Sequence, residues 1–120
     1  MKRDNDLVRR ILLATEEADG RVAVEQLQTT LDVSRDELVY HIKLLRDQGY
    51  LEATILYADD MAYVVMISGL TGAGHDLLDA IRDAAIWKRV LRKLGATAAG
   101  VSLKVIEATA VGLALKSAGM

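Results

Sequence analysis

The stretch Ser34–Leu51, S-R-D-E-L-V-Y-H-I-K-L-L-R-D-Q-G-Y-L, carries the strongest fold signal in this 120-residue chain. Ser34 and Glu37 have the S-x-x-E spacing of a capping box, so we expect a helix to begin at about Arg35. Apolar residues then recur at i, i+4 and i+7 and predict its buried stripe, Leu38, Ile42 and Leu45. Gly49 follows as a stop signal, and an apolar strand is expected directly after it.

The segment before this helix predicts two further helices and a short strand. Apolar residues recur at helical spacing from Asp6 to near Gly20, with Asp4 or Asp6 as the cap. The opposite side of that helix is charged, with Arg9, Arg10, Glu16 and Glu17. Arg21–Val24 is prone to β structure, and Glu25–Leu31 has the pattern of a short helix. The helix that begins at Arg35 is therefore the third in the chain.

The segment after the third helix predicts a hairpin and three more helices. Two β-branched and aromatic runs, Tyr50–Tyr57 and Met61–Ser68, flank a polar turn at 58–60 and are typical of antiparallel strands. Three helices are expected to follow: one capped by Thr71, a basic one over Trp87–Gly95, and one over Leu103–Lys116 capped by Ser102. The last of them is apolar nearly all round, which is typical of a helix buried against something.

The order of these elements is that of a winged helix-turn-helix, an α+β fold in which a three-helix core carries a β-hairpin wing. We expect residues 1–85 to form this domain. Residues 86–120 are expected to form a C-terminal helical extension that packs on the domain or mediates dimerisation. In such a fold the third helix is the usual reader of a DNA groove.

Several motifs resemble those of known families. Y-H-I-K-L-L-R-D-Q-G-Y-L and the run Leu70-Thr71-x-x-Gly74 are similar to winged-helix regulators of the antibiotic-resistance and arsenic-repressor types. The motifs M-K-R-D-x-D-L-V-R and I-S-G-L-T-x-x-G-H-D, with Ile86-Trp87, resemble an uncharacterised family of small winged-helix proteins from bacteria, phages and prophages. That resemblance implies the fold and a mobile-element setting, and it transfers no catalytic residue.

The first functional hypothesis is a DNA-binding transcriptional regulator. The helical projection of the third helix predicts its DNA contacts as Arg35, Val39, Tyr40, Lys43 and Arg46, with Arg suited to guanine edges and Lys to phosphates. DNA affinity, however, depends largely on phosphate contacts from basic residues. Residues 1–60 hold 8 basic and 13 acidic residues, a net charge of −5, whereas residues 61–120 hold 7 and 4, a net charge of +3.

The second hypothesis follows from this acidity. The predicted wing tip carries Asp59 and Asp60 where a minor-groove arm would carry Arg. The acidic wing and reader helix would then contact a basic protein partner, and the chain would be a non-enzymatic interaction module. Both hypotheses remain open at this point.

The C-terminal part offers a basic patch and an oligomerisation surface. The patch, Lys88, Arg89, Arg92 and Lys93, fits a solvated helix face, contact with nucleic acid, or docking on the acidic half of a second subunit. Trp87 beside it fits a packing anchor or an interface hot spot. The residues predicted to mediate a homodimer are Ile106, Val111, Leu113 and Leu115. The alternative is that this helix folds back and completes a monomer core.

Composition limits the remaining chemistry. The chain has no Cys, which excludes disulfides, a thiolate nucleophile and Cys-based metal centres. His75 and Asp79 have i, i+4 spacing but lack a third ligand, and Gly69–Gly74 lacks the lysine of a phosphate loop. We therefore expect no enzymatic activity, no metal site and no cofactor. The charged N-terminus and the absence of a long apolar run predict a cytoplasmic protein that does not bind membranes.

Overall fold

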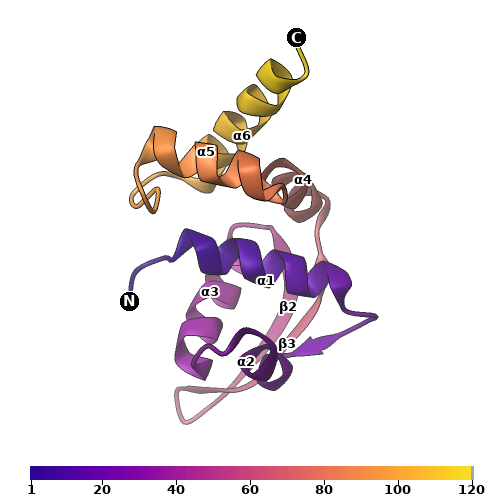
Figure 1. The fold of residues 1–120 in the computed structure, drawn as a ribbon. Coiled ribbons are helices and arrows are strands. Elements are labelled where there is room, and N and C mark those ends of the chain that lie inside the picture. Colours follow the sequence, from indigo (N-terminus) through magenta and orange to yellow (C-terminus); the bar gives the residue numbers. More distant parts are fainter. Residues whose placement is uncertain (120) are drawn as a thin grey trace.

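The computed structural model describes residues 1–119 and has the predicted α+β winged helix-turn-helix fold with additional C-terminal helices (Figure 1). Its elements are α1 (Asn5–Glu17), β1 (Val22–Ala23), α2 (Val24–Leu31), α3 (Arg35–Asp47), β2 (Leu51–Ala58), β3 (Met61–Leu70), α4 (Gly72–Ile81), α5 (Ala84–Leu94) and α6 (Leu103–Ser117). Within residues 1–119, no helix is long and apolar enough to cross a membrane.

The predicted helix caps are confirmed. The side chains of Asp4, Ser34, Thr71 and Ser102 each accept hydrogen bonds from amides in the first turn that follows. The expected start of the fifth helix is wrong: α5 begins at Ala84 rather than Trp87, because the Asp83 carboxylate accepts from the Ile86 amide. The predicted division between residues 85 and 86 consequently falls inside α5.

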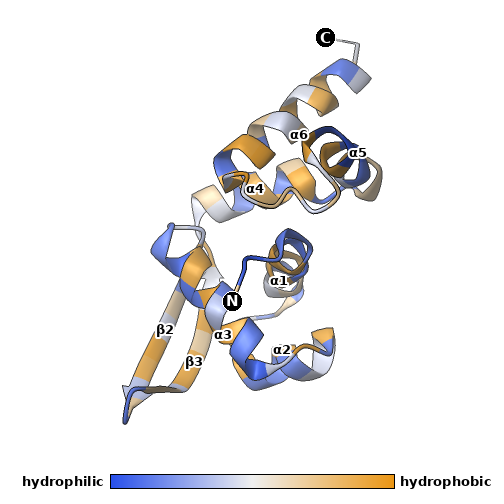
Figure 2. Cartoon of the chain, turned by 90° about the vertical axis from the view of Figure 1, so that its left-hand side faces the viewer, coloured by the Kyte–Doolittle hydropathy of each residue, from blue (hydrophilic) through white to orange (hydrophobic). Residues whose placement is uncertain are grey.

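The wing is a two-stranded hairpin within a three-stranded antiparallel sheet of order β1-β3-β2. Its turn residues Asp59 and Asp60 have φ of 51° and 64°. Positive φ at both central residues is the type I′ geometry that matches the twist of a hairpin. In Figure 2 the turn lies at the far end of the hairpin, apart from the helices.

Helix α1 lies at the centre of the molecule, between α2 and α3 on one side and α4 and α5 on the other (Figure 1). Its residues Leu7, Ile11 and Leu12 are almost fully buried, and they belong to one apolar cluster that also includes Leu38 and Ile106. The winged helix and the C-terminal helices therefore share a continuous core.

The polar residues of α1 hold other helices in place. Arg9 donates hydrogen bonds to the carbonyls of Ile81 and Arg82 at the end of α4, and Arg10 donates to the carbonyl of Leu31 at the end of α2. These carbonyls have no partner within their own helices, so the two arginines act as C-caps supplied from another element. Arg9 and Arg10 lie on the predicted charged side of α1, and their side chains lie across the ends of α4 and α2.

The motif around Thr71 forms a close junction between β3 and α4. The Thr71 hydroxyl accepts from the Gly74 amide and donates to the Gly49 carbonyl at 2.6 Å. The Thr71 amide donates to the Tyr50 carbonyl. The start of α4 is thereby fixed to the end of α3 and the start of β2.

Candidate nucleic-acid interface

Arg35, the first of the five predicted DNA contacts, is engaged within the protein. Its guanidinium donates to the carbonyls of Ala62 and Tyr63 on β3, at 2.8 and 3.2 Å. It also pairs with Glu25 on α2 at 3.3 Å. Arg35 therefore joins the start of α3 to the wing and to α2, and each of its three nitrogens donates one hydrogen bond within the protein. The helical projection could not reveal these partners, which lie on other elements.

Lys43 and Arg46 lie on the surface of α3, where both pair with one carboxylate. Asp47 accepts from Lys43 at 3.1 Å and from Arg46 at 2.9 Å. Hydrogen bonds from Lys43, then from Arg46, lower the pKa of Asp47 below its ordinary value. Asp47 is therefore ionised at neutral pH, and a phosphate must compete with it for both cations.

Val39 and Tyr40, the remaining predicted contacts, are partly buried. Val39 packs against the apolar core. The Tyr40 ring meets the His41 ring edge to face, with centroids 5.1 Å apart. His41 itself is buried, with Nε2 accepting from the Asp4 amide and Nδ1 lying 2.7 Å from the Glu37 carbonyl. These contacts fit a neutral ring that donates through Nδ1. The accessible row on α3 is thus Tyr40, Lys43 and Arg46.

The wing combines acidic and apolar residues. Asp59 and Asp60 are exposed at the tip, as predicted, and residues 47–81 contain no Lys or Arg. The hairpin also exposes four large apolar side chains that the sequence did not single out, namely Leu56, Tyr57, Met61 and Tyr63. A register shift between Leu56 and Tyr57 interrupts the strand alternation there, so the pattern alone could not show which side chains leave the core.

The basic patch lies on α5. Lys88, Arg92 and Lys93 are exposed, and no salt bridge to them occurs within residues 1–119. Arg89 is half-buried and donates to the Ser117 hydroxyl on α6. Trp87 is a packing anchor, because it is 5% exposed and its indole N–H donates to the Asp6 carboxylate on α1.

The four residues predicted for oligomerisation separate into two pairs. Ile106 and Leu113 are 1% and 8% exposed and pack into the chain's own core, so they are unavailable to a second subunit. Val111 and Leu115, on the other side of α6, are 45% and 48% exposed. Burial of the first pair is explained by the contacts of α6 with α4 and α5.

Asp79, predicted at i, i+4 spacing from His75, is paired with Arg82 instead. Asp79 accepts from Arg82 at 2.7 Å, and Arg82 also holds Glu16 of α1, which lowers the pKa of Glu16. Within residues 1–119, no three His, Asp or Glu side chains are grouped closely enough to hold a metal ion. The glycines of Gly69–Gly74 surround the Thr71 cap described above.

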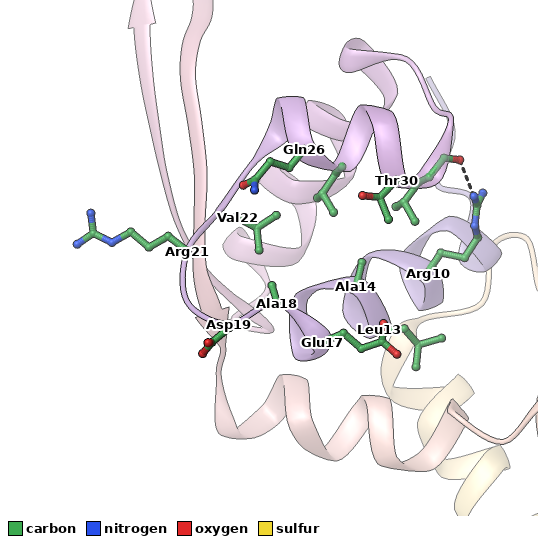
Figure 3. A pocket seen from close by; sticks show the side chains of 12 residues that line it. Arg10, Leu13, Ala14, Glu17, Ala18, Asp19, Arg21, Val22, Gln26 and Thr30 are labelled. Atoms are coloured by element: carbon green, nitrogen blue, oxygen red, sulfur yellow. Dashed lines mark hydrogen bonds between the residues drawn. The ribbon is translucent and has the colours of Figure 1, made fainter.

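A cavity of about 520 Å³ opens between α1 and α2 (Figure 3). Its lining includes the apolar Leu13, Ala14 and Leu27, together with Gln26 and Thr30. Opposite charges also line it, Arg10 and Arg21 against Glu17 and Asp19, and Figure 3 shows Arg10 turned to the carbonyl at the end of α2. The lining therefore favours no particular ligand charge.

Comparison with solved structures supports the winged-helix fold. A transcriptional regulator homologue from Pyrococcus horikoshii OT3 superposes with a TM-score of 0.52 at 21% identity, over 76% of this chain and 85% of that one. AbsC, a MarR family transcriptional regulator from Streptomyces coelicolor, gives 0.51 at 15% identity, over 78% and 72%. At these identities the likeness shows the fold.

Sequence comparison places the chain among relatives of similar length. An uncharacterized protein of Haemophilus influenzae (strain ATCC 51907 / DSM 11121 / KW20 / Rd) is 35% identical over 115 residues, which cover 92% of each protein. Residues 2–102 match the model of a family described as hypothetical protein DUF2513. These residues include all of the two sequence motifs except Met1, and every element from α1 to α5, so the chain belongs to the DUF2513 family.

Proposed function

We propose that this chain is a winged-helix DNA-binding protein that regulates transcription without catalysing a reaction. The observation that carries the proposal is the accessible row Tyr40, Lys43 and Arg46 on α3, a helix fixed at its start by the Ser34 cap and by Arg35. The two solved structures of similar fold are transcriptional regulators, which supports it. A phage or prophage setting stays a prediction from the motif resemblance.

Binding would require Asp47 to release its cations. In the free protein the pairs Lys43–Asp47 and Arg46–Asp47 are exposed, and such pairs contribute only about 0–1 kcal/mol. A phosphate or a guanine edge can therefore replace the carboxylate at modest cost. The Asp47 carboxylate would then lie close to the DNA phosphates and weaken binding. Replacing Asp47 with a neutral residue therefore tests whether the DNA lies against α3.

Asp47→Asn is expected to tighten binding to a random-sequence duplex by about fivefold, because it frees two cations and removes a negative charge. Lys43→Ala and Arg46→Ala should each weaken binding and lower the slope of log affinity against log salt by about one unit. Fluorescence anisotropy of a labelled duplex at about 50 and 200 mM salt measures both effects.

Lys93→Ala is the matched control, since it removes an exposed cation from α5 rather than α3. Its affinity and salt slope should equal those of the wild type. If Lys93→Ala lowers the slope while the α3 variants leave it unchanged, the basic patch binds the nucleic acid and α3 does not.

We further propose that the regulator is a homodimer formed through the exposed side of α6. Val105, Val111 and Leu115 are 45–48% exposed there, and α6 extends away from the body in both views (Figures 1 and 2). A twofold axis along this side would pair the two copies and present two α3 helices, which in winged-helix dimers lie about one turn of duplex apart.

Leu115→Glu is expected to convert the dimer to a monomer, because it places a charge in an apolar contact without touching the core. Light scattering coupled to size-exclusion chromatography gives the mass. Met61→Glu on the wing alters a side chain that is even more exposed and should leave the dimer intact. A wild-type mass of 13.1 kDa at micromolar concentration would contradict the dimer.

The acidic, apolar wing favours the second candidate, a protein-interaction module. The wing does not compete with α3 for residues, so a protein contact there is compatible with DNA binding by α3.

A further inference from the structure

Strand β2 has a free edge. In the sheet order β1-β3-β2 it pairs only with β3, and Figure 2 shows it at the outer side of the hairpin. Within residues 1–119, no side chain hydrogen-bonds to the backbone of β2. The opposite edge of the hairpin is different, because Arg35 occupies the carbonyls of Ala62 and Tyr63 and β1 pairs with Met66 and Ile67.

Three of the usual protections against pairing are absent from this edge. Natural edge strands carry Lys or Pro, or are very short, or are twisted away by β-bulges, so that they do not accept a further strand. The two register shifts of the β2–β3 pair leave their extra residues, Ser68 and Tyr63, on β3 rather than on β2. Strand β2 is eight residues long, and its sequence L-E-A-T-I-L-Y-A has neither residue type. Its unpaired amides and carbonyls can therefore receive an added strand.

Apolar side chains accompany this edge. Leu56 and Tyr57 on β2 are each 55% exposed, and Met61 and Tyr63 on β3 are 71% and 75% exposed. We call these four residues the wing patch. Large exposed apolar groups gathered on one hairpin indicate a contact surface rather than chance exposure.

The negative charge around the wing patch favours a positively charged partner. Glu52 lies near the start of β2, and Asp59 and Asp60 form the turn at its other end. Residues 47–81 contain no Lys or Arg. Two cations reach the hairpin from other elements: Arg35 lies against the Ala62 and Tyr63 carbonyls and is paired with Glu25, and Arg21 lies beside Thr54, so the tip itself stays acidic. A partner that carries Lys or Arg beside apolar residues complements both properties, whereas DNA phosphates would be repelled.

We propose that the free edge of β2, with the wing patch, docks an extended basic segment of a partner protein as an additional β-strand. Backbone hydrogen bonds to the β2 edge would supply the pairing. Alternate apolar side chains of the segment would contact the wing patch, and its Lys or Arg side chains would face Glu52 and Asp59.

A second copy of the chain fits this edge poorly. In an antiparallel β2–β2 pair centred between Ile55 and Leu56, Glu52 of one copy would lie opposite Asp59 of the other. Like charges directly opposite each other destabilise a strand pair. In this register the edge therefore favours a basic segment over a second copy of the chain.

The docking strand is independent of the proposed DNA function, since it uses none of Tyr40, Lys43 and Arg46. Loss of DNA binding in the α3 variants should leave peptide binding at β2 unchanged. Failure of either proposal is therefore distinguishable from failure of the other.

The test uses the full chain, labelled with ¹⁵N, and two synthetic peptides. One is Thr-Lys-Val-Lys-Val-Lys-Thr, and the other has Glu in place of each Lys. The Lys peptide is expected to shift the amide resonances of residues 51–58 and to slow their hydrogen exchange, while the Glu peptide leaves them unchanged. Equal shifts with both peptides, or Lys-peptide shifts confined to α3 or to the cavity between α1 and α2, would overturn the proposal.

Two variants test the edge and the charge separately. Leu56→Lys places a protective lysine on the edge, and Asp59→Asn with Asp60→Asn removes the tip charge while keeping a residue type that tolerates positive φ. Each should weaken Lys-peptide binding at least fivefold. Ala99→Lys, which adds a lysine at an exposed residue between α5 and α6, is the control and should bind as the wild type does. Unchanged affinity in both wing variants would contradict docking at β2.

Discussion

Gly74→Ala is expected to lower the melting temperature by about 10 °C or more, which corresponds to about 3 kcal/mol of unfolding free energy. A Cβ atom at Gly74 would overlap the carbonyl oxygen of Tyr50 and lie 3.1 Å from its carbonyl carbon. Both atoms belong to the backbone, so no flexible side chain can move aside. The start of α4 would have to shift away from β2, with loss of the Thr71 contacts to Gly49 and Tyr50.

Gly72→Ala is the matched control two residues earlier in the same helix. A Cβ atom there meets nothing within 4 Å. Because alanine is the better helix former, Gly72→Ala should leave the melting temperature unchanged or raise it by a few degrees. Thermal unfolding followed by circular dichroism compares the two. Equal melting temperatures for Gly74→Ala and the wild type would show that the junction relaxes and that the motif glycine has another role.

The helix caps were predictable from the sequence because their partners are local. The side chains of Ser34, Thr71 and Ser102 each accept a hydrogen bond from the backbone amide three residues later. Both partners therefore lie within one short stretch of sequence, where the residue pattern reveals them. The hairpin was predictable for the same reason, since its strands are joined by two turn residues. These local signals are sufficient to predict the order of helices and strands, and that order is the one found in winged helix-turn-helix proteins.

Partners that are distant in the sequence could not be predicted. Arg9 bonds carbonyls 72 and 73 residues away, and Arg35 bonds carbonyls 27 and 28 residues away. Helical periodicity shows which side of a helix is polar, but it does not show what covers that side. The helical projection therefore predicts a DNA contact for Arg35, whereas in the structure Arg35 joins α3 to the wing.

The pairing of Lys43 with Asp47, by contrast, was within reach of sequence reasoning. The two residues are four apart on a helix, a spacing at which opposite charges meet. This spacing already indicates that a carboxylate offsets positive charge on the outer face of the third helix. The exposed apolar residues of the wing were not within reach, because their exposure depends on where the hairpin leaves the core.

Asn5→Asp is expected to lower the urea midpoint of unfolding by about 1–2 M, because it removes two buried hydrogen bonds that close the N-terminus onto the C-terminal half. The Asn5 side chain is 3% exposed, and its amide group donates to the carbonyls of Thr97 and Ala98 at 2.9 and 3.0 Å. An ionised aspartate has the same shape but cannot donate. The Arg3 guanidinium, which donates to Asn5 Oδ1 at 2.8 Å, would offset part of the added charge, but the second carboxylate oxygen would lie against two carbonyl oxygens in a buried site.

The adjacent substitution Asp6→Asn is the control. It replaces a carboxylate by an amide at a residue whose side chain accepts a hydrogen bond from Trp87. The amide side chain introduced there would still present an oxygen to the indole N–H of Trp87, so the midpoint should move little. Trp87 is the single tryptophan, and its fluorescence therefore reports the packing of α5 on α1. In Asn5→Asp this fluorescence should change at lower urea than in Asp6→Asn. Coincident midpoints for the two variants would mean that the Asn5 bonds contribute nothing to stability, and that the apolar core alone joins the two halves of the molecule.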